Sequence, residues 1–320
     1  MGLWQESMIG LARSERAKQV MQRLAGRTVL ARRFAVIGNG GTAIATARRL
    51  HDDLGISASL CYLGEYVDDA TAIRRTVEAS IDVAGLLGAA GLDVNVSIDP
   101  TAIGHLRGED TFQRNAERIG QAVADAAGDA GGRLMLDMED LALVEPTLRA
   151  LRRLLAKGLP AAITLQARLL RTRADVRDLV HLRTAVRLVK GAFPLGPEHD
   201  HQGRDAITRE YLSLAAMMLA PEARDAGFRP VFATHDDAIL RSVARLASRN
   251  GWPKAAYEFE FLYGVRPDWQ QKLRASGHSV RVYVPFGTDW WPYAVRRIGE
   301  NPRNALLLGR ALLGRTYQRG

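Results

Sequence analysis

Short hydrophobic runs alternate along this chain with longer segments of helical spacing. Eight runs of five to seven residues read as strands, and they lie at 57–63, 92–98, 133–138, 161–166, 185–190, 230–234, 257–261 and 279–284. Several of them are apolar at most positions rather than at every second one. That pattern is typical of strands that are covered on both faces, as in parallel sheets.

The segments between these runs have the spacing of amphipathic helices, at 70–87, 111–127, 144–155, 175–182, 206–219, 237–248 and 267–275. Strands that alternate with helices predict parallel pairing, because each helix carries the chain back to the start of the next strand. Eight such units predict an α/β fold of the (β/α)8 TIM-barrel type. The alternative is an open, doubly wound sheet.

The chain before the first strand has a different character. Residues 5–52 are expected to be helical, with amphipathic spacing at 15–24 and a second helix that follows a glycine-rich turn. We therefore predict an N-terminal helical segment at 1–52 and a barrel at 53–320.

The glycine-rich turn resembles a dinucleotide-binding loop. It reads Val36-Ile-Gly38-Asn-Gly40-Gly-Thr-Ala43, so Ala43 stands where the third glycine of G-x-G-x-x-G belongs. The hydrophobic run before it is short, and Glu65 lies too far along the chain to serve as the acidic residue of that motif. We therefore disfavour a Rossmann fold.

The amino-acid composition excludes several kinds of site. The 320 residues are 47% hydrophobic and 25% charged, with a net charge of +9 that is spread along the chain. A single cysteine, Cys61, excludes an intramolecular disulfide and a structural zinc site built of several cysteines. The charge is compatible with anionic ligands and peripheral membrane contact, but no recognised nucleic-acid-binding module occurs.

The N-terminus lacks the basic and apolar regions of a secretion signal, and no window reaches the roughly 18 apolar residues of a membrane span. We expect a cytoplasmic protein.

Polar residues recur where the expected strands end. They are Glu65, Asp99, Asp137, Gln166, Arg187, Lys190, Thr234, His235, Glu258, Glu260 and Tyr283. In a barrel of this type the active site lies at the carboxyl ends of the strands. Arg187 and Lys190 stand within an apolar run, and buried charges need partners. An anionic ligand over the barrel mouth would supply one.

A divalent metal site is an alternative, because Asp137, His235 and Glu258 carry suitable ligand groups. No H-x-H pair stands on the first strand, so we predict no metal. Catalysis by a serine or cysteine nucleophile has no support, since there is no G-x-S-x-G and Cys61 lies within a strand.

The C-terminal region combines aromatic and basic residues. After Tyr283 a Pro/Gly turn leads to Tyr293, and a helix then carries Arg296, Arg297 and Glu300. The arginine fork matches a carboxylate with two parallel hydrogen bonds. Adjacent arginines close to aromatic side chains suit the capture of a small carboxylate.

Taken together, six motifs resemble the proline dehydrogenases of the monofunctional, FAD-dependent type. They are Leu136-Asp-Met-Glu139, Leu165-Gln-Ala167, Arg187-Leu-Val-Lys-Gly-Ala192, Ala233-Thr-His-Asp236, Tyr257-Glu-Phe-Glu-Phe-Leu-Tyr-Gly264 and the tail from Tyr283 to Glu300. The resemblance runs from about residue 30 to the end. It implies a distorted (β/α)8 barrel with FAD at its mouth and a C-terminal helix over that mouth.

The resemblance also assigns roles to residues. It implies that FAD is bound by Gln166, Arg187, Lys190, Gly191, Thr234, His235 and Glu258. It implies a substrate site formed by Asp137, Leu188, Tyr283, Tyr293, Arg296, Arg297 and Glu300, with Asp99 and Phe193 beside it. The implied reaction is the oxidation of L-proline to 1-pyrroline-5-carboxylate by hydride transfer to flavin N5. A quinone or another carrier would then take the electrons.

Several positions depart from the family's pattern. Asp99 stands where the family has a lysine that helps to hold the substrate carboxylate, and Phe193 replaces a tyrosine. Arg168, Asp236 and Glu260 also differ. The alternative is therefore a related flavoenzyme that oxidises the C–N or N–N bond of a different or modified amino acid. A flavin-binding barrel without catalysis is a further alternative, although Asp137, Lys190 and the arginine pair speak against it. The sequence does not reveal the oligomeric state.

Overall fold

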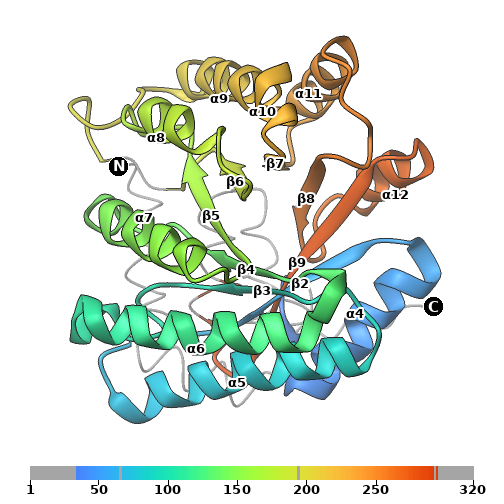
Figure 1. Ribbon diagram of the computed structural model, residues 1–320. Coiled ribbons are helices and arrows are strands. Elements are labelled where there is room, and N and C mark those ends of the chain that lie inside the picture. The colour runs from blue at the N-terminus through green and yellow to red at the C-terminus, as the bar shows by residue number, and fades with distance from the viewer. Residues whose placement is uncertain (1–33, 65–66, 193–194, 292, 295–320) are drawn as a thin grey trace, which may run out of the picture.

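The computed structural model describes residues 34–64, 67–192, 195–291 and 293–294 (Figure 1). Most of the predicted N-terminal helical segment, and the C-terminal helix expected over the mouth, lie outside these ranges.

Eight parallel strands form a closed barrel, because the last strand pairs with both the seventh and the first. The strands are β2 (Ser57–Tyr62), β3 (Asn95–Ile98), β4 (Arg133–Leu136), β5 (Ala161–Gln166), β6 (Ala185–Val189), β7 (Arg229–Ala233), β8 (Glu258–Leu262) and β9 (Ser279–Gly287). Each coincides with one predicted run to within a few residues. The predicted (β/α)8 barrel is confirmed, and the open-sheet alternative is wrong.

Helices cover the outside of the barrel (Figure 1). They are α4 (Gly40–Leu54), α5 (Ala70–Ala89), α6 (Glu109–Ala127), α7 (Leu141–Ala156), α8 (Thr172–Leu179), α9 (Arg204–Met218), α10 (Pro221–Asp225), α11 (Asp237–Arg249) and α12 (Pro267–Ala275), with short 3-10 turns at His105–Arg107 and Gly128–Ala130. The sequence pattern did not predict α10, because five residues are too short to show helical periodicity. No helix in the described ranges is both long and apolar enough to cross a membrane.

The glycine-rich turn of the N-terminal region begins a barrel helix. A two-residue strand, β1 (Val36–Ile37), pairs with the last residues of β9, and α4 starts directly after it. The Asn39 side chain accepts a hydrogen bond from the Thr42 amide at 3.3 Å, which caps the helix. Helix α4 packs on β2, β9 and α5 and so closes the ring of helices between the first and last barrel strands. The predicted boundary at residue 52 falls within α4.

The two faces of the strands differ in chemistry. Outward-facing residues belong to one large hydrophobic core with the helices, for example Leu60, Val96, Ile163, Val186, Phe232, Phe259 and Val282. The alternate residues face the interior, and many are polar, namely Ser59, Asn95, Ser97, Thr164, Arg187, Glu260 and Arg281. A small cluster of Met135, Ala162, Ala185 and Val231 supplies the apolar part of that interior. The barrel therefore carries charge through its centre.

Candidate active site at the barrel mouth

A buried arginine occupies the centre of the barrel. Arg187, on β6, is 4% exposed, and its Nε and Nη2 donate to the two carboxylate oxygens of Glu260 at 2.8 Å each. Its Nη1 donates to Asp137 and, at 3.3 Å, to Thr164, while Nη2 also donates to Ser97 at 3.0 Å. All five N–H groups of the guanidinium are thus engaged by protein atoms.

This network keeps Arg187 charged. Burial alone would lower its pKa, but the carboxylates of Glu260 and Asp137 outweigh that effect and raise the pKa above its ordinary value. The resemblance implies that Arg187 approaches the flavin and its phosphates. In the structure its fork binds Glu260 and Asp137, and its role toward the cofactor stays a prediction.

Asp137 connects Arg187 with Tyr283, which lies at the mouth. The Tyr283 hydroxyl donates to Asp137 Oδ2 at 3.0 Å, and the Thr164 hydroxyl donates to Oδ1 at 3.0 Å. The Arg187 guanidinium lies over the Tyr283 ring, 5.2 Å from its centroid. Burial, and next the charge of Asp137, raise the pKa of Tyr283 well above its usual range. Tyr283 is therefore protonated at neutral pH and acts as a hydrogen-bond donor.

Asp99 shares this end of the barrel. It follows β3, and its charge raises the pKa of both Cys61 and Tyr283, after the larger effect of burial. Cys61 is consequently a neutral thiol rather than a reactive thiolate. Tyr293 is 7% exposed and lies near enough to Tyr283 to affect the pKa of that phenol. Two carboxylates and two tyrosines thus converge where the resemblance implies a substrate site.

Sequence reasoning did not assign a role to Glu139, the last residue of Leu136-Asp-Met-Glu139. Its carboxylate accepts hydrogen bonds from the Thr101 amide at 2.8 Å and the Thr101 hydroxyl at 2.5 Å. Burial nevertheless raises the pKa of Glu139 to about 7. Its neutral form is therefore favoured as the pH falls below about 7. The raised pKa marks it as a functional-site candidate.

At the carboxyl ends of β5 and β6, the rim of the barrel mouth carries Gln166, Lys190 and Gly191. Gly191 has φ +93°, and a Cβ there would lie 2.7 Å from Gln166 Oε1 and 2.8 Å from the Arg168 side chain. Gln166 is itself held in place, since its Nε2 donates to the Glu139 carbonyl at 2.8 Å. Lys190 next to it keeps a side chain that is 36% exposed. This rim therefore offers the Lys190 cation, and Gly191 lets the Gln166 and Arg168 side chains pack against the backbone beside it.

The rim continues after β7. Lys190 Nζ lies 2.9 Å from Asp236 Oδ2, and Asp236 also caps α11 through the Ala238 amide at 3.0 Å. The Thr234 hydroxyl accepts from the Asp236 amide at 3.2 Å. The His235 ring packs 5.8 Å from the Phe261 ring between centroids. The expected cofactor residues Thr234 and His235 thus stand on the same rim as Lys190.

The expected position of Glu258 was wrong. It is the first residue of β8 and pairs in register with Val231 and Ser279, so it lies in the amino-terminal half of the barrel. There it forms ion pairs with Arg133 and Arg281. The predicted run at 257–261 begins one residue before Glu258, so this glutamate enters the strand rather than leaving it.

Leu188 was also misplaced. Because Arg187 points into the barrel, Leu188 faces outward, where it joins the core beneath the helices.

Sequence reasoning missed Leu262, the last residue of β8 and the register partner of Tyr283. Leu262 stands two and four positions after Glu260 and Glu258, so strict alternation places it on the inner face at the mouth.

Other candidates lie outside the described residues: Glu65, Phe193, Arg296, Arg297 and Glu300. Among the residues that the structure describes, no group of three His, Cys, Asp or Glu side chains could hold a metal ion.

Comparison with known sequences adds a second line of evidence. The family model described as proline dehydrogenase matches residues 43–308. The chain is 35% identical over 289 residues to a proline dehydrogenase of Deinococcus radiodurans, which covers 89% of this chain and 90% of that protein. It is 30% identical over 288 residues to proline dehydrogenase 1 of Bacillus subtilis, which covers 90% of this chain and 92% of that protein.

Solved structures share the fold. Proline utilization A from Bdellovibrio bacteriovorus superposes with a TM-score of 0.76 over 94% of this chain, at 19% identity. The same protein from Corynebacterium freiburgense gives 0.71 over 98% of this chain, at 20% identity. This chain covers 35% of each of those longer chains. At such identities the likeness shows the barrel fold and no more.

Proposed function

This chain belongs to the proline dehydrogenase family, and from that premise we propose that it oxidises L-proline to 1-pyrroline-5-carboxylate as an FAD-dependent oxidoreductase acting on a CH–NH group. The observation that carries the proposal is the match to relatives named proline dehydrogenase along about nine tenths of both chains. The convergence of Asp99, Asp137, Tyr283 and Tyr293 at the mouth supports it.

The rim fits the cofactor that the family implies. Lys190 offers a cation for a pyrophosphate, and the absence of a side chain at Gly191 lets Gln166 and Arg168 pack directly against the backbone there, which holds the Gln166 amide at the rim. Thr234 and His235 would hold the remainder of the dinucleotide. When bound, FAD supplies the hydride acceptor.

Replacement of Gly191 with alanine should prevent retention of FAD. The new Cβ would meet Gln166 and Arg168 at 2.7–2.8 Å, in a backbone conformation that L-residues rarely adopt. Gly203→Ala is the matched control, because Gly203 has φ +82° but nothing within 4 Å of an added Cβ. The ratio of flavin absorbance to protein after gel filtration should fall for Gly191→Ala alone. Equal flavin content in both variants would remove Gly191 from the cofactor site.

The chain's own residues have three tasks in the proposed reaction. Arg296 and Arg297 would grip the substrate carboxylate, with Glu300 orienting them. Tyr283, fixed by its hydrogen bond to Asp137, forms a wall with Tyr293 against which the ring packs. Together they exclude water and hold the reacting C–H at one position, which converts binding energy into rate. The ring nitrogen must be neutral, since an ammonium has no lone pair to assist loss of hydride.

The test of the proposed function is anaerobic bleaching of the bound flavin. L-proline should bleach it faster than hydroxyproline, pipecolate or N-substituted amino acids. Bleaching by an analogue with an additional amine, but not by L-proline, would contradict the proposal. It would favour the modified-amino-acid alternative, in which Asp99 pairs the extra cation. A flavin that no substrate reduces would favour a non-catalytic barrel.

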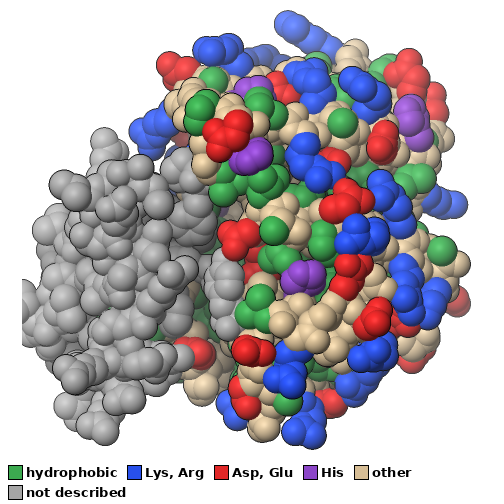
Figure 2. Space-filling model, turned by 90° about the vertical axis from the view of Figure 1, so that its left-hand side faces the viewer, with side chains coloured by type: hydrophobic (Ala, Val, Ile, Leu, Met, Phe, Trp, Pro, Cys, Tyr) green, Lys and Arg blue, Asp and Glu red, His purple; other side chains and the backbone are tan. Residues whose placement is uncertain are grey.

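We propose that a quinone or another carrier reoxidises the flavin. On the face shown in Figure 2, basic and acidic side chains are mixed over the described surface, which does not suggest a nucleic-acid site. A cytoplasmic location and peripheral membrane contact stay predictions.

A further inference from the structure

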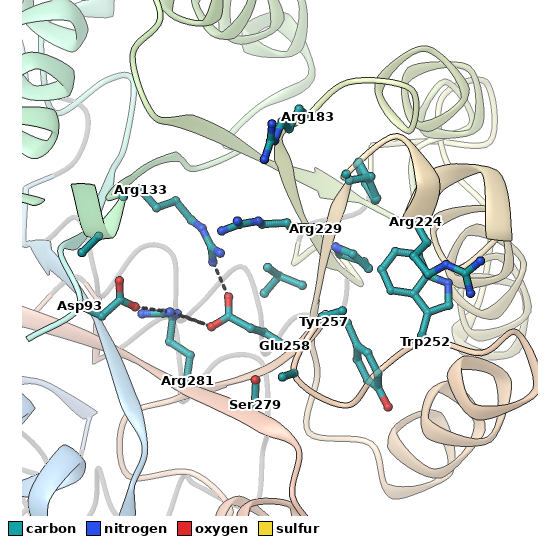
Figure 3. A pocket seen from close by; sticks show the side chains of 18 residues that line it. Asp93, Arg133, Arg183, Arg224, Arg229, Trp252, Tyr257, Glu258, Ser279 and Arg281 are labelled. Carbon is teal, nitrogen blue, oxygen red and sulfur yellow. Dashed lines mark hydrogen bonds and ion pairs between the residues drawn. The ribbon is translucent and has the colours of Figure 1, made fainter. Parts of the chain in front are cut away.

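A pocket of about 490 Å³ opens at the amino-terminal end of the strands, away from the mouth (Figure 3). The first residues of four strands line it, namely Arg133 of β4, Arg229 of β7, Glu258 of β8 and Ser279 of β9. Its volume is typical of small-molecule sites, which span roughly 300–1,000 Å³.

Part of the charge in this pocket is balanced. Glu258 pairs with Arg133 and, at 2.7 Å, with Arg281, and Arg281 pairs with Asp93 at 2.5 Å. Two arginines therefore face two carboxylates. Burial acts to raise the pKa of Glu258, but the charges of Arg133 and Arg281 hold it well below its ordinary value. This chain of ion pairs is closed and needs no ligand.

Two further arginines are not balanced. Arg183, just before β6, and Arg229 line the same pocket, and neither side chain has a hydrogen bond or an ion pair with any residue of the described part of the chain. Arg224, which also lines the pocket, is paired with Asp225 at 3.1 Å. The surplus is therefore the two positive charges of Arg183 and Arg229.

The side chains of Arg183 and Arg229 both line this one pocket. In Figure 3 the Arg229 side chain extends toward the Arg133 guanidinium, and Arg183 lies above Arg229 at the edge of the same pocket. Arg183 lies across Gly227, where a Cβ would come within 3.3 Å of its Cγ. Gly227 has φ +77°, which favours glycine, and the absence of a Cβ there leaves room for the arginine stem. Both residues are exposed, so water screens the repulsion between the two charges and leaves both guanidiniums accessible to an anion.

We propose that this pocket binds a small polyanion with at least two oxyanion groups, phosphate or carboxylate, held by the forks of Arg183 and Arg229. A guanidinium matches either group with two parallel hydrogen bonds. Two arginines on one pocket favour a ligand with more than one such group. The site is separate from the FAD rim, because it stands at the opposite end of the strands.

Isothermal titration calorimetry on the flavin-loaded full chain tests this site at low ionic strength. Pyrophosphate is the phosphate probe and citrate the carboxylate probe. At least one should bind with a 1:1 stoichiometry, and Arg183→Gln and Arg229→Gln should each weaken it by about ten-fold. The variant that carries both changes should not bind measurably. The probe that binds more tightly identifies the oxyanion.

Arg75→Gln is the matched control, because it removes the same charge from the exposed side of α5, outside the pocket. It should leave the affinity unchanged, and flavin content should be the same in all variants. The proposal is overturned if neither probe binds with a Kd below about 1 mM. It is equally overturned if the doubly changed variant binds as tightly as the parent chain. Neither result depends on whether the enzyme oxidises proline.

Discussion

Arg187→Met is expected to lower the free energy of unfolding by about 3–5 kcal/mol, since it removes one partner from a buried ion network. Asp137 and Glu260 would stay inside the barrel without the cation that neutralises them. Methionine fills a similar length, so the loss reports charge more than volume. Chemical denaturation of the purified chain, followed by circular dichroism, would measure it.

Arg171→Met is the control for this change. Arg171 also has two carboxylate partners, Asp175 at 2.9 Å and Glu145 at 3.0 Å, but its side chain is 35% exposed. Exposed pairs contribute roughly 0–1 kcal/mol, so this variant should lose little stability. The combination of Arg187→Met with Glu260→Gln should lose less than the sum of the two single changes, because the cation and its carboxylate are neutralised together. Equal losses for Arg187→Met and Arg171→Met would show that the buried network is not what stabilises the barrel.

Asp137→Asn is expected to lower kcat/KM for L-proline by about 100-fold while flavin content is retained. Asp137 is the common acceptor of Arg187, Thr164 and Tyr283, so its charge orients the tyrosine that we propose as the substrate wall. A misplacement of about 1 Å in such a wall can cost this much. Steady-state kinetics with an artificial electron acceptor would measure the effect.

Two further variants separate the effect of the Asp137 charge from other causes of a lower kcat/KM. Tyr283→Phe removes one hydrogen bond and should cost less than Asp137→Asn, about ten-fold. Asp178→Asn makes the same chemical change on the exposed side of α8 and should have no effect. If Asp137→Asn stayed within about two-fold of the parent chain, the mouth would have to be assigned to other residues.

Local patterning was sufficient for the fold. Hydrophobic runs mark strands because the outward face of each must be buried under helices, and the inward face here carries small residues such as Ala162 and Ala185 that also read as apolar. That double burial explains why the predicted runs coincide with the observed strands. The same reasoning placed Asp99, Asp137, Gln166 and Tyr283 at the mouth, because each stands at or near the carboxyl end of its strand.

The predicted site positions were wrong where a shift of one residue along a strand changes the side of the sheet, or the end of the strand, at which a side chain lies. Glu258 enters β8 at its amino end, and Leu188 follows an inward-facing arginine and so points outward. A motif indicates that such residues occur together, but not which side of a strand each faces. Counting alternate positions from Arg187 and Glu260 would have excluded Leu188 and found Leu262.

The sequence by itself determined the barrel, its family and the polar strand ends, because these depend on spacing between neighbouring residues and on motifs. Only the tertiary structure decided that Arg187 pairs with Glu260, 73 residues away, and with Asp137, 50 residues away. It alone brought Arg183 and Arg229 into one pocket at the far end. Such meetings depend on the closure of the barrel, which sets the stagger of strands that are distant in the chain, and no local pattern encodes that stagger.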